Sequence, residues 1–316
     1  MVDQLLSQGL RLSTKLTYAS AQRSFIDFCN QYHLCVVPAK EQTLLWYIAH
    51  TQSRPGFKSL KASTLKVHLA AIRALHVMSG FPAPPTSSPR IHIMIKAIFE
   101  HGPCPLRKLP ITFSILRHLL SLIGAAPSNL VWHSALSLGF FGGLRGAEYT
   151  LATSSHGLLC PPLLVSHITF GTFNGTRYMS VYVPRSKTRP HGFQLSIGCS
   201  GTQTCAVCST QSYLSHRAHM GSLAPQSYAF VLPDGSPITK NMLNQKIKCL
   251  VASIGLDPKQ YSSHSLRTGV ATTAAIAGFN EVQVKAIAGW TSQAYMLYIR
   301  NVQFEQISFA KRLTVN

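Results

Sequence analysis

Residues 261–301 read YSSHSLRTGVATTAAIAGFNEVQVKAIAGWTSQAYMLYIRN. This stretch combines histidine, arginine, tryptophan and tyrosine residues within about forty positions. His264 and Arg267 stand three residues apart, directly after serines that can cap a helix, so both side chains project from one side of the first turn. Both side chains lie at the helix N-terminus, the positive end of the helix dipole, so together they could bind an anion. A capped helix with a solvated arginine is the alternative, because H-x-x-R alone is a short pattern.

Two further stretches upstream carry groups of the same chemistry. In GFFGGLRGAEYT (139–150), Glu148 follows Arg145 by three residues, so the carboxylate can hold a neighbouring basic side chain in one orientation. Lys187 lies in VPRSKTRPHG (183–192), between two expected strands, where a turn would project its ammonium group into a cleft. A surface ion pair and a solvated turn lysine are the plain alternatives.

The charge balance of the chain is strongly basic. The 316 residues include 29 Lys and Arg against 9 Asp and Glu, a net charge of +20. The excess is shared, with 11 basic and 4 acidic residues up to residue 105 and 18 and 5 after it. This distribution favours a polyanion that contacts both parts of the chain. A basic solvated surface, or one that binds anionic membranes, is the alternative. No apolar run is long enough to span a bilayer, and the first twenty residues lack a signal-peptide core.

The first third of the chain has helical periodicity throughout. Helices are expected at 13–34, 41–50, 59–80 and 89–100. The segment HGPCPLRKLP (101–110) then reads as a linker, with three prolines and two basic residues. We therefore expect two domains, 1–105 and 106–316.

After the linker the pattern is mixed. Helices are expected at 111–124, capped by Thr112, and at 128–143, capped by Ser128. Three short β-branched or aromatic runs, SHITF, RYMSVYV and FQLSI, predict a small antiparallel sheet. Helical patterns return at 204–220, 239–255, 265–278, 280–289 and 292–301. The predicted fold is mainly α, with a small antiparallel sheet in the second domain.

Eight cysteines are too sparse for a disulfide scaffold, so a reducing compartment is expected. Cys205 and Cys208 have metal-ligand spacing, and Cys199 or His191 could add a ligand, but no second pair completes a tetrahedral set. Ordinary turn or core cysteines, without a metal, are the favoured interpretation.

Taken in chain order, the motifs GLRGAE, RSKT, HSLR, AGW and LYIR resemble the active site of the tyrosine recombinase, or phage-integrase, family. The resemblance covers residues 112–300, and the four helices of 13–100 fit that family's helical, SAM-like core-binding domain. It implies a two-domain clamp on double-stranded DNA, with residues 106–316 as the catalytic domain, and a homo-oligomer, a tetramer on DNA. The site residues it implies are Arg145, Lys187, His264, Arg267, Trp290 and Tyr298, supported by Glu148.

The chemistry of these groups is consistent with breaking a phosphodiester bond without a metal or another cofactor. Tyr298 supplies a nucleophile, and Tyr295, three residues earlier, is the alternative. The guanidinium groups of Arg145 and Arg267 can each bind two non-bridging oxygens and neutralise their charge. Lys187 is the candidate acid, and His264 can bind the phosphate or relay the proton of the tyrosine. Trp290 would pack beside the phosphate. Further DNA contacts are expected from Lys61, Lys66, Arg73, Arg107, Lys108, Arg185 and Arg189.

One departure from the family pattern narrows the resemblance. The interval from Trp290 to Tyr298 is eight residues, whereas nine is usual in bacterial members. The shorter interval resembles eukaryotic mobile-element recombinases of the Crypton and DIRS type, which implies a nuclear location, or a cytoplasmic one outside eukaryotes, and no secretion. A type IB topoisomerase and a catalytically silent DNA-binding descendant are the other two interpretations.

Overall fold

The computed structural model describes residues 1, 9–53, 58–103, 107–124, 126–154, 157–287 and 290. The chain forms two compact units, Met1–Pro105 and Leu106–Asn316. Within the described residues, no helix has the length and apolar character needed to cross a membrane. Each unit has its own apolar core.

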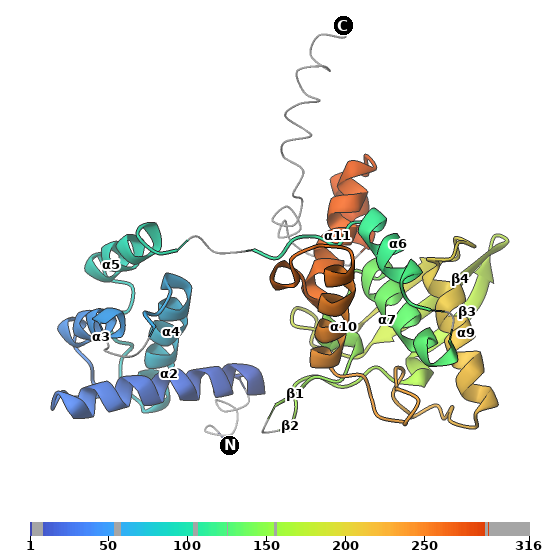
Figure 1. Cartoon of the computed structure of the whole chain (residues 1–316). Helices are drawn as coiled ribbons and strands as arrows, with labels where there is room; N and C mark the ends of the chain where they lie inside the picture. The colour runs from blue at the N-terminus through green and yellow to red at the C-terminus, as the bar shows by residue number, and fades with distance from the viewer. Residues whose placement is uncertain are drawn as a thin grey trace, which may run out of the picture. The chain divides into compact units, whose positions relative to one another are not determined.

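The described residues of the first unit form four helices, drawn from blue to teal in Figure 1. They are α2 (Leu12–Gln31), α3 (Glu41–Ser53), α4 (Ala62–Met78) and α5 (Pro89–Glu100). All four helices expected from the periodicity of this region are present.

The core of this unit is aromatic at its centre. Phe25 and Tyr47 are fully buried and meet edge to face, with ring centroids 5.2 Å apart. The Tyr47 hydroxyl is paired with Ser24 Oγ at 3.0 Å and with His68 Nδ1 at 2.7 Å, so its polar end is satisfied. The α5 helix begins as its sequence predicts, because Ser88 Oγ accepts from the backbone N–H of Ile91 and Pro89 occupies the first turn.

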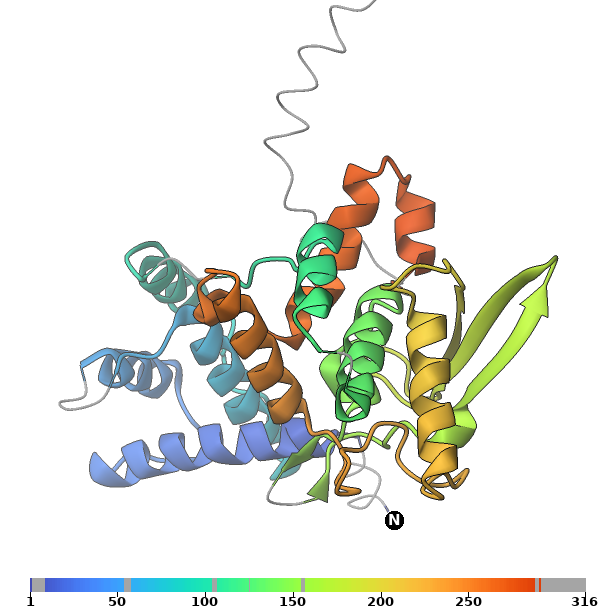
Figure 2. The same cartoon turned by 45° about the vertical axis from the view of Figure 1, so that its right-hand side comes forward.

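The second unit is organised around α7 (Leu130–Phe141), which is apolar on all sides and almost wholly buried. Around it lie α6 (Phe113–Ser121), α9 (Ala206–His219) and α11 (Ser263–Ile276). The described residues of the unit also form the helices α8 (Gly146–Tyr149), α10 (Lys240–Ser253) and α12 (Glu281–Ile287). Figures 1 and 2 both show α7 and α9 side by side.

One predicted cap is confirmed and the other is wrong. Thr112 Oγ accepts from the backbone N–H of Ile115 and caps α6. Ser128 does not cap the next helix, because Pro127–Asn129 forms a 3₁₀ turn and α7 begins only at Leu130. Proline in the first turn of this 3₁₀ segment fixes the backbone before the α-helical pattern starts.

The predicted antiparallel sheet is confirmed, with strand order β3 (Ile168–Phe173), β4 (Thr176–Val183) and β5 (Phe193–Gly198). Asn174 and Gly175 both adopt positive φ in the turn that joins β3 to β4, as a tight hairpin requires. Figure 2 shows this hairpin projecting from the body of the unit. A two-stranded pair, β1 (Thr153–Ser154) with β2 (Gly157–Leu158), was not predicted. The chain is therefore mainly α with a small antiparallel sheet, as the sequence indicates.

The segment that enters the second unit lies directly against α11. The backbone N–H of Ile111 donates to the carbonyl of Ser265 at 2.9 Å, and that of Phe113 donates to Thr273 Oγ1 at 3.1 Å. Gly269 makes this approach possible, because a Cβ at that position would lie 1.7 Å from the Ile111 carbonyl oxygen. The glycine two residues after Arg267 is thus fixed by close backbone packing.

We expect Gly269→Ala to lower the midpoint of thermal unfolding of the second unit markedly. Alanine favours a helix by about 1 kcal/mol over glycine, but the clash with backbone cannot be relieved by rotating a side chain and resembles core overpacking, which costs about 1–3 kcal/mol or more. Ile276→Ala, at a half-exposed position of the same helix, is the control and should change the midpoint far less. A Gly269→Ala variant as stable as the parent chain would contradict the packing described here.

Candidate active site

Arg145 is positioned by a sharp turn at the end of α7. Gly143 adopts φ +55°, and its N–H donates to the Phe140 carbonyl at 2.9 Å. The left-handed conformation at this glycine ends the helix and redirects the chain, so that Arg145 stands in extended conformation directly before α8. The two glycines of the GLRGAE region therefore set the direction in which Arg145 leaves the core.

Glu148 holds Arg145 by two hydrogen bonds. Its carboxylate accepts from the Arg145 backbone N–H at 2.8 Å and from Nη1 of the guanidinium at 2.7 Å. The Glu148 side chain is 2% exposed and that of Arg145 is 32% exposed, so the pair is anchored at the carboxylate and open to solvent at the guanidinium. A buried, doubly bonded pair of this kind fixes orientation, unlike a surface ion pair.

The start of α11 lies against the same turn. A Cβ on Gly146 would lie 2.7 Å from Ser263 Oγ, so only glycine lets the two elements approach this closely. The backbone N–H of Ser263 donates to Asn244 Oδ1 at 2.8 Å, which ties the helix start to α10. His264 follows in the first turn and is exposed, as the H-x-x-R pattern predicts for a group that faces an anion.

Arg267, one turn later, is buried. It is 2% exposed, its Nη1 donates to the carbonyl of Gly143, and its guanidinium carbon lies 4.7 Å from the ring centroid of Trp290. The interpretation of this residue as a solvated arginine after a cap is therefore wrong. Trp290 is itself 8% exposed and belongs to the core, so its indole ring covers the guanidinium and limits its movement.

The turn that carries Lys187 is organised by Ser186. Ser186 is 1% exposed, and its hydroxyl accepts from the backbone N–H groups of Thr188 and Arg189, both at 3.2 Å. Its own N–H donates to the Arg189 carbonyl at 2.9 Å. Lys187, between these fixed residues, is exposed. A rigid turn thus presents a lysine to solvent, as expected for a proton donor that must reach a substrate.

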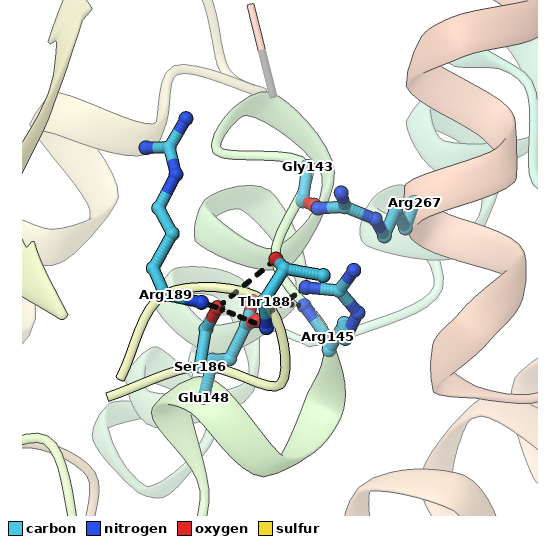
Figure 3. A network of polar contacts seen from close by, with 7 residues as sticks. All are labelled: Gly143, Arg145, Glu148, Ser186, Thr188, Arg189 and Arg267. Atoms are coloured by element: carbon cyan, nitrogen blue, oxygen red, sulfur yellow. Dashed lines mark hydrogen bonds and ion pairs between the residues drawn. The ribbon is translucent and has the colours of Figure 1, made fainter. Parts of the chain in front are cut away.

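These elements converge in one region of the second unit. Figure 3 draws the Arg145–Glu148 pair, the Gly143–Arg267 contact and the 186–189 turn as a single network of polar contacts. Arg189 and Trp290 also line one pocket, together with Lys285. The structure therefore brings Arg145, Glu148, Arg267 and Trp290 together with the turn that carries Lys187.

The predicted nucleophile Tyr298 and its alternative Tyr295 lie outside the described residues. Two tyrosines that flank the site motifs are poor nucleophiles. Tyr149 is 2% exposed, and burial, followed by the negative charge of Glu148, raises the pKa of its hydroxyl well above the usual range. Burial also raises the pKa of Tyr261, which is 4% exposed. The Tyr149 hydroxyl oxygen is itself buried.

The other predicted DNA contacts are at the surface of their own units. Lys61, Lys66 and Arg73 are exposed along α4, and Lys66 and Arg73 line a groove of about 300 Å³ that α5 closes on its other side. In the second unit Arg107 and Arg185 are exposed; Arg189 is half-buried with its guanidinium 4.8 Å from the ring centroid of Phe193. Lys108 is also half-buried, and its ammonium donates to the Lys259 carbonyl.

The structure adds a cation that the sequence reasoning missed. Lys240 is exposed at the first position of α10, and its Cγ would lie 3.4 Å from a Cβ on Gly146. A lysine at a helix N-terminus opposes the helix dipole, and α10 has no acidic residue in its first turn. That placement was the available signal, because a bound anion would compensate it. Ser186 and Asn244, which position the backbone, gave no comparable signal.

Comparison with known proteins gives one sequence relative and several solved structures. No known protein-family profile matches the chain. Over 272 residues it is 25% identical to an integrase/recombinase xerD homolog of Selenomonas ruminantium, a match that covers 83% of this chain and 74% of the relative.

Three solved structures illustrate the similarity in fold. XerH site-specific recombinase in a post-cleavage complex with palindromic difH substrate matches with a TM-score of 0.64 at 16% identity, over 94% of this chain and 79% of that one. The Tn1549 transposon integrase bound to transposon right end DNA matches with a TM-score of 0.61 at 15% identity, over 97% and 99%. A lambda integrase dimer bound to a COC′ core site matches with a TM-score of 0.56 at 12% identity, over 94% and 92%.

The solved structures establish the fold, and the relative extends the likeness to the sequence of most of the chain. Among the described residues, the site brings together groups from the GLRGAE, RSKT and HSLR motifs and Trp290. This chain is therefore similar in fold to solved recombinases and integrases, and similar over most of its sequence to an integrase/recombinase.

Proposed function

We propose that the chain cleaves and rejoins DNA through a 3′-phosphotyrosyl intermediate. The observation that carries this proposal is the convergence of a carboxylate-anchored Arg145, a buried Arg267 and a rigid lysine turn in one region of a strongly basic protein. The relative is an integrase/recombinase, and the solved neighbours are recombinases and integrases bound to DNA. Residues 106–316 would be the catalytic domain and residues 1–105 a core-binding domain that completes a clamp on the duplex.

The reaction balances with the groups that the chain supplies. His264 accepts the proton of the Tyr298 hydroxyl as its oxygen attacks phosphorus, and a phosphotyrosyl bond forms while the bond to the 5′ oxygen breaks. Arg145, Arg267 and His264 would stabilise the charge on the non-bridging oxygens, and Lys187 would protonate the departing 5′ oxygen. Because the new ester keeps the energy of the old one, attack by a 5′ hydroxyl reverses the step and rejoins the strand without ATP.

Lys240 extends this assignment. It lies at the start of α10, beside the contact between Gly146 and the start of α11, and so adds an exposed cation next to the turn that carries Arg145. We assign it a contact with the phosphate next to the scissile one, where a point charge contributes affinity and needs no fixed geometry.

The finer features of the proposal rest on the sequence. The eight-residue interval from Trp290 to Tyr298 supports a eukaryotic mobile-element recombinase of the Crypton or DIRS type. Such an enzyme acts in the nucleus, or in the cytoplasm if the source is not eukaryotic, and exchanges strands as a tetramer on DNA. The lambda integrase neighbour is a dimer on its core site, which supports assembly of more than one protomer on DNA.

A random-sequence substrate pool tests the proposed cleavage without a defined target site. The full chain is incubated with random-sequence duplexes that carry a nick, so that cleavage near the nick releases a short fragment and traps the adduct. DNA that remains attached after denaturation is then recovered and sequenced. We expect DNA linked through its 3′ end, with a free 5′ end, and convergence of the recovered sequences on one site. Binding without covalent attachment would instead identify a silent DNA-binding descendant.

A type IB topoisomerase would behave differently in the same assay. It would also leave a 3′-linked adduct, but the recovered sequences would not converge, and the protein would relax supercoiled plasmid as a monomer. Enrichment of a site therefore separates recombination from topoisomerase activity.

Glu148→Gln isolates the positioning role of the buried carboxylate. The amide has the same size and keeps an acceptor for the Arg145 backbone N–H, but it loses the charge that fixes the guanidinium. We expect adduct formation at saturating DNA to slow by about 10–100-fold while the half-saturating DNA concentration stays nearly constant. Glu100→Gln, the same change in an exposed ion pair of the first unit, is the control. Equal effects of the two changes would contradict the positioning role.

A further inference from the structure

Three cysteines of the second unit, distant from the proposed chemistry in sequence, converge at one point. Cys199 follows the end of β5, Cys205 is the N-terminal cap of α9, and Cys208 lies in the first turn of that helix. The sulfur of Cys199 lies 3.6 Å from that of Cys205 and 3.4 Å from that of Cys208. All three sulfurs lie within 4.8 Å of one another, and they are the one such group of potential metal ligands found among the described residues.

This spacing matches a metal site better than a disulfide. Sulfurs bound to one zinc ion at about 2.3 Å in a tetrahedron lie about 3.8 Å apart. A disulfide would place two of them about 2.05 Å apart and leave the third unused. None of the described cysteines forms a disulfide. The separations of Cys199 from Cys208 and from Cys205, 3.4 and 3.6 Å, are therefore close to those between corners of a zinc tetrahedron.

The surrounding backbone is arranged to stabilise sulfur in its thiolate form. The N–H groups of Ser200 and Cys208 both donate to the Cys205 sulfur, at 3.3 and 3.5 Å. Three adjacent thiols do not all ionise by themselves, because their negative charges repel, and a bound cation supplies the charge that removes the remaining protons.

Arg177 provides a further electrostatic contribution from outside the three ligands. It lies on β4, and its Nη2 donates to the sulfurs of Cys199 and Cys208, at 3.5 and 3.3 Å. A divalent ion with three thiolates carries one net negative charge, which one arginine offsets. Hydrogen bonds from neighbouring groups to metal-bound sulfur are a regular feature of such sites.

We propose that Cys199, Cys205 and Cys208 bind a soft divalent metal ion, Zn²⁺ in the first instance, with the fourth position taken by solvent. The inference does not depend on the proposed function, and it replaces the expectation from the sequence that these are ordinary turn cysteines. Of the two candidates for a third ligand, Cys199 and His191, the fold places Cys199, at the end of β5, beside Cys205 and Cys208.

The site would fix the hairpin that carries the candidate acid. The β5 strand connects the Lys187 turn to Cys199, and it pairs antiparallel with β4. The Cys199 backbone N–H also donates to the Arg177 carbonyl at 2.7 Å. A metal that joins Cys199 to the start of α9 therefore ties the far end of this hairpin to a core helix.

The test uses the reduced full chain and Co²⁺ as a spectroscopic substitute for Zn²⁺. We expect one equivalent of Co²⁺ to bind, with a thiolate-to-metal charge-transfer band and the strong visible bands of tetrahedral coordination, and Zn²⁺ to abolish both. Cys205→Ser and Cys208→Ser should weaken binding by at least about 100-fold, because each removes one of three ligands. Cys249→Ser, at an exposed position of α10, is the matched control and should leave the titration unchanged.

A second measurement keeps the proposal testable if the serine variants fail to fold. The wild-type chain is alkylated with and without Zn²⁺, and each cysteine is followed by peptide mass spectrometry. We expect Zn²⁺ to protect Cys199, Cys205 and Cys208 selectively, while the exposed Cys35 and Cys249 react equally in both conditions. Absence of the charge-transfer band, protection of no cysteine by Zn²⁺, or a disulfide that forms within the cluster and persists in the presence of Zn²⁺ would each overturn the proposal.

Discussion

Tyr298→Phe is expected to abolish the covalent protein–DNA adduct while DNA affinity changes by less than about threefold. Removal of one oxygen eliminates the only atom that can attack phosphorus in the proposed reaction, and loss of a nucleophile lowers an enzymatic rate by roughly 10⁴-fold or more. Binding depends instead on many phosphate contacts spread over a chain of net charge +20. The measurement compares adducts on a denaturing gel with DNA binding under native conditions, on a site recovered from the random pool.

Tyr295→Phe is the matched control, since it makes the same change three residues earlier. On a regular helix the two side chains point in directions about 60° apart, so only one can face a fixed phosphate. We expect the Tyr295→Phe variant to form the adduct at close to the parental rate. An adduct that persists in Tyr298→Phe and disappears in Tyr295→Phe would move the nucleophile to Tyr295 and leave the rest of the site unchanged.

The local patterns of the sequence predicted the elements of the fold well, because each is determined by nearby residues. Alternating β-branched and aromatic residues predicted the three strands, helical periodicity predicted α5, and Thr112 predicted the start of α6. Ser128 failed as a cap because Pro127 favours a 3₁₀ turn there, a competition that a hydroxyl before an apolar run does not show.

The parts of the site that depend on long-range packing were not predictable. Gly269 looks like an ordinary helical glycine until the Ile111 carbonyl is placed against it. The sequence alone also allowed Arg267 to be a solvated arginine. In the structure its guanidinium contacts Gly143 and Trp290, which come from segments far apart in the chain. Single-sequence patterns identify the residue types of such a site, but its burial and orientation are decided by elements that meet only in the folded chain.

Lys187→Ala is expected to slow adduct formation by about 10²–10⁴-fold, the usual contribution of a general acid, with little loss of DNA affinity. The rigid turn around Ser186 presents the ammonium group to solvent, where it can reach the 5′ oxygen as the bond to phosphorus breaks. Lys248→Ala removes the same charge from an exposed position of α10 and should have almost no effect. The rate is measured on a substrate whose scissile phosphate lies at the recovered site.

A substrate with sulfur in place of the leaving 5′ oxygen separates proton donation from charge stabilisation. A thiolate leaves readily without a proton, so Lys187→Ala should regain most of its rate on this substrate, to within about tenfold of the parent chain. Arg145→Lys and Arg267→Lys keep the positive charge but lose the fork that binds two non-bridging oxygens, and they should stay slow on both substrates. Rescue of an arginine variant, together with continued inactivity of Lys187→Ala, would reverse the assignment of the acid. In that outcome the lysine turn would position DNA, and the proton would have to come from another group such as His264.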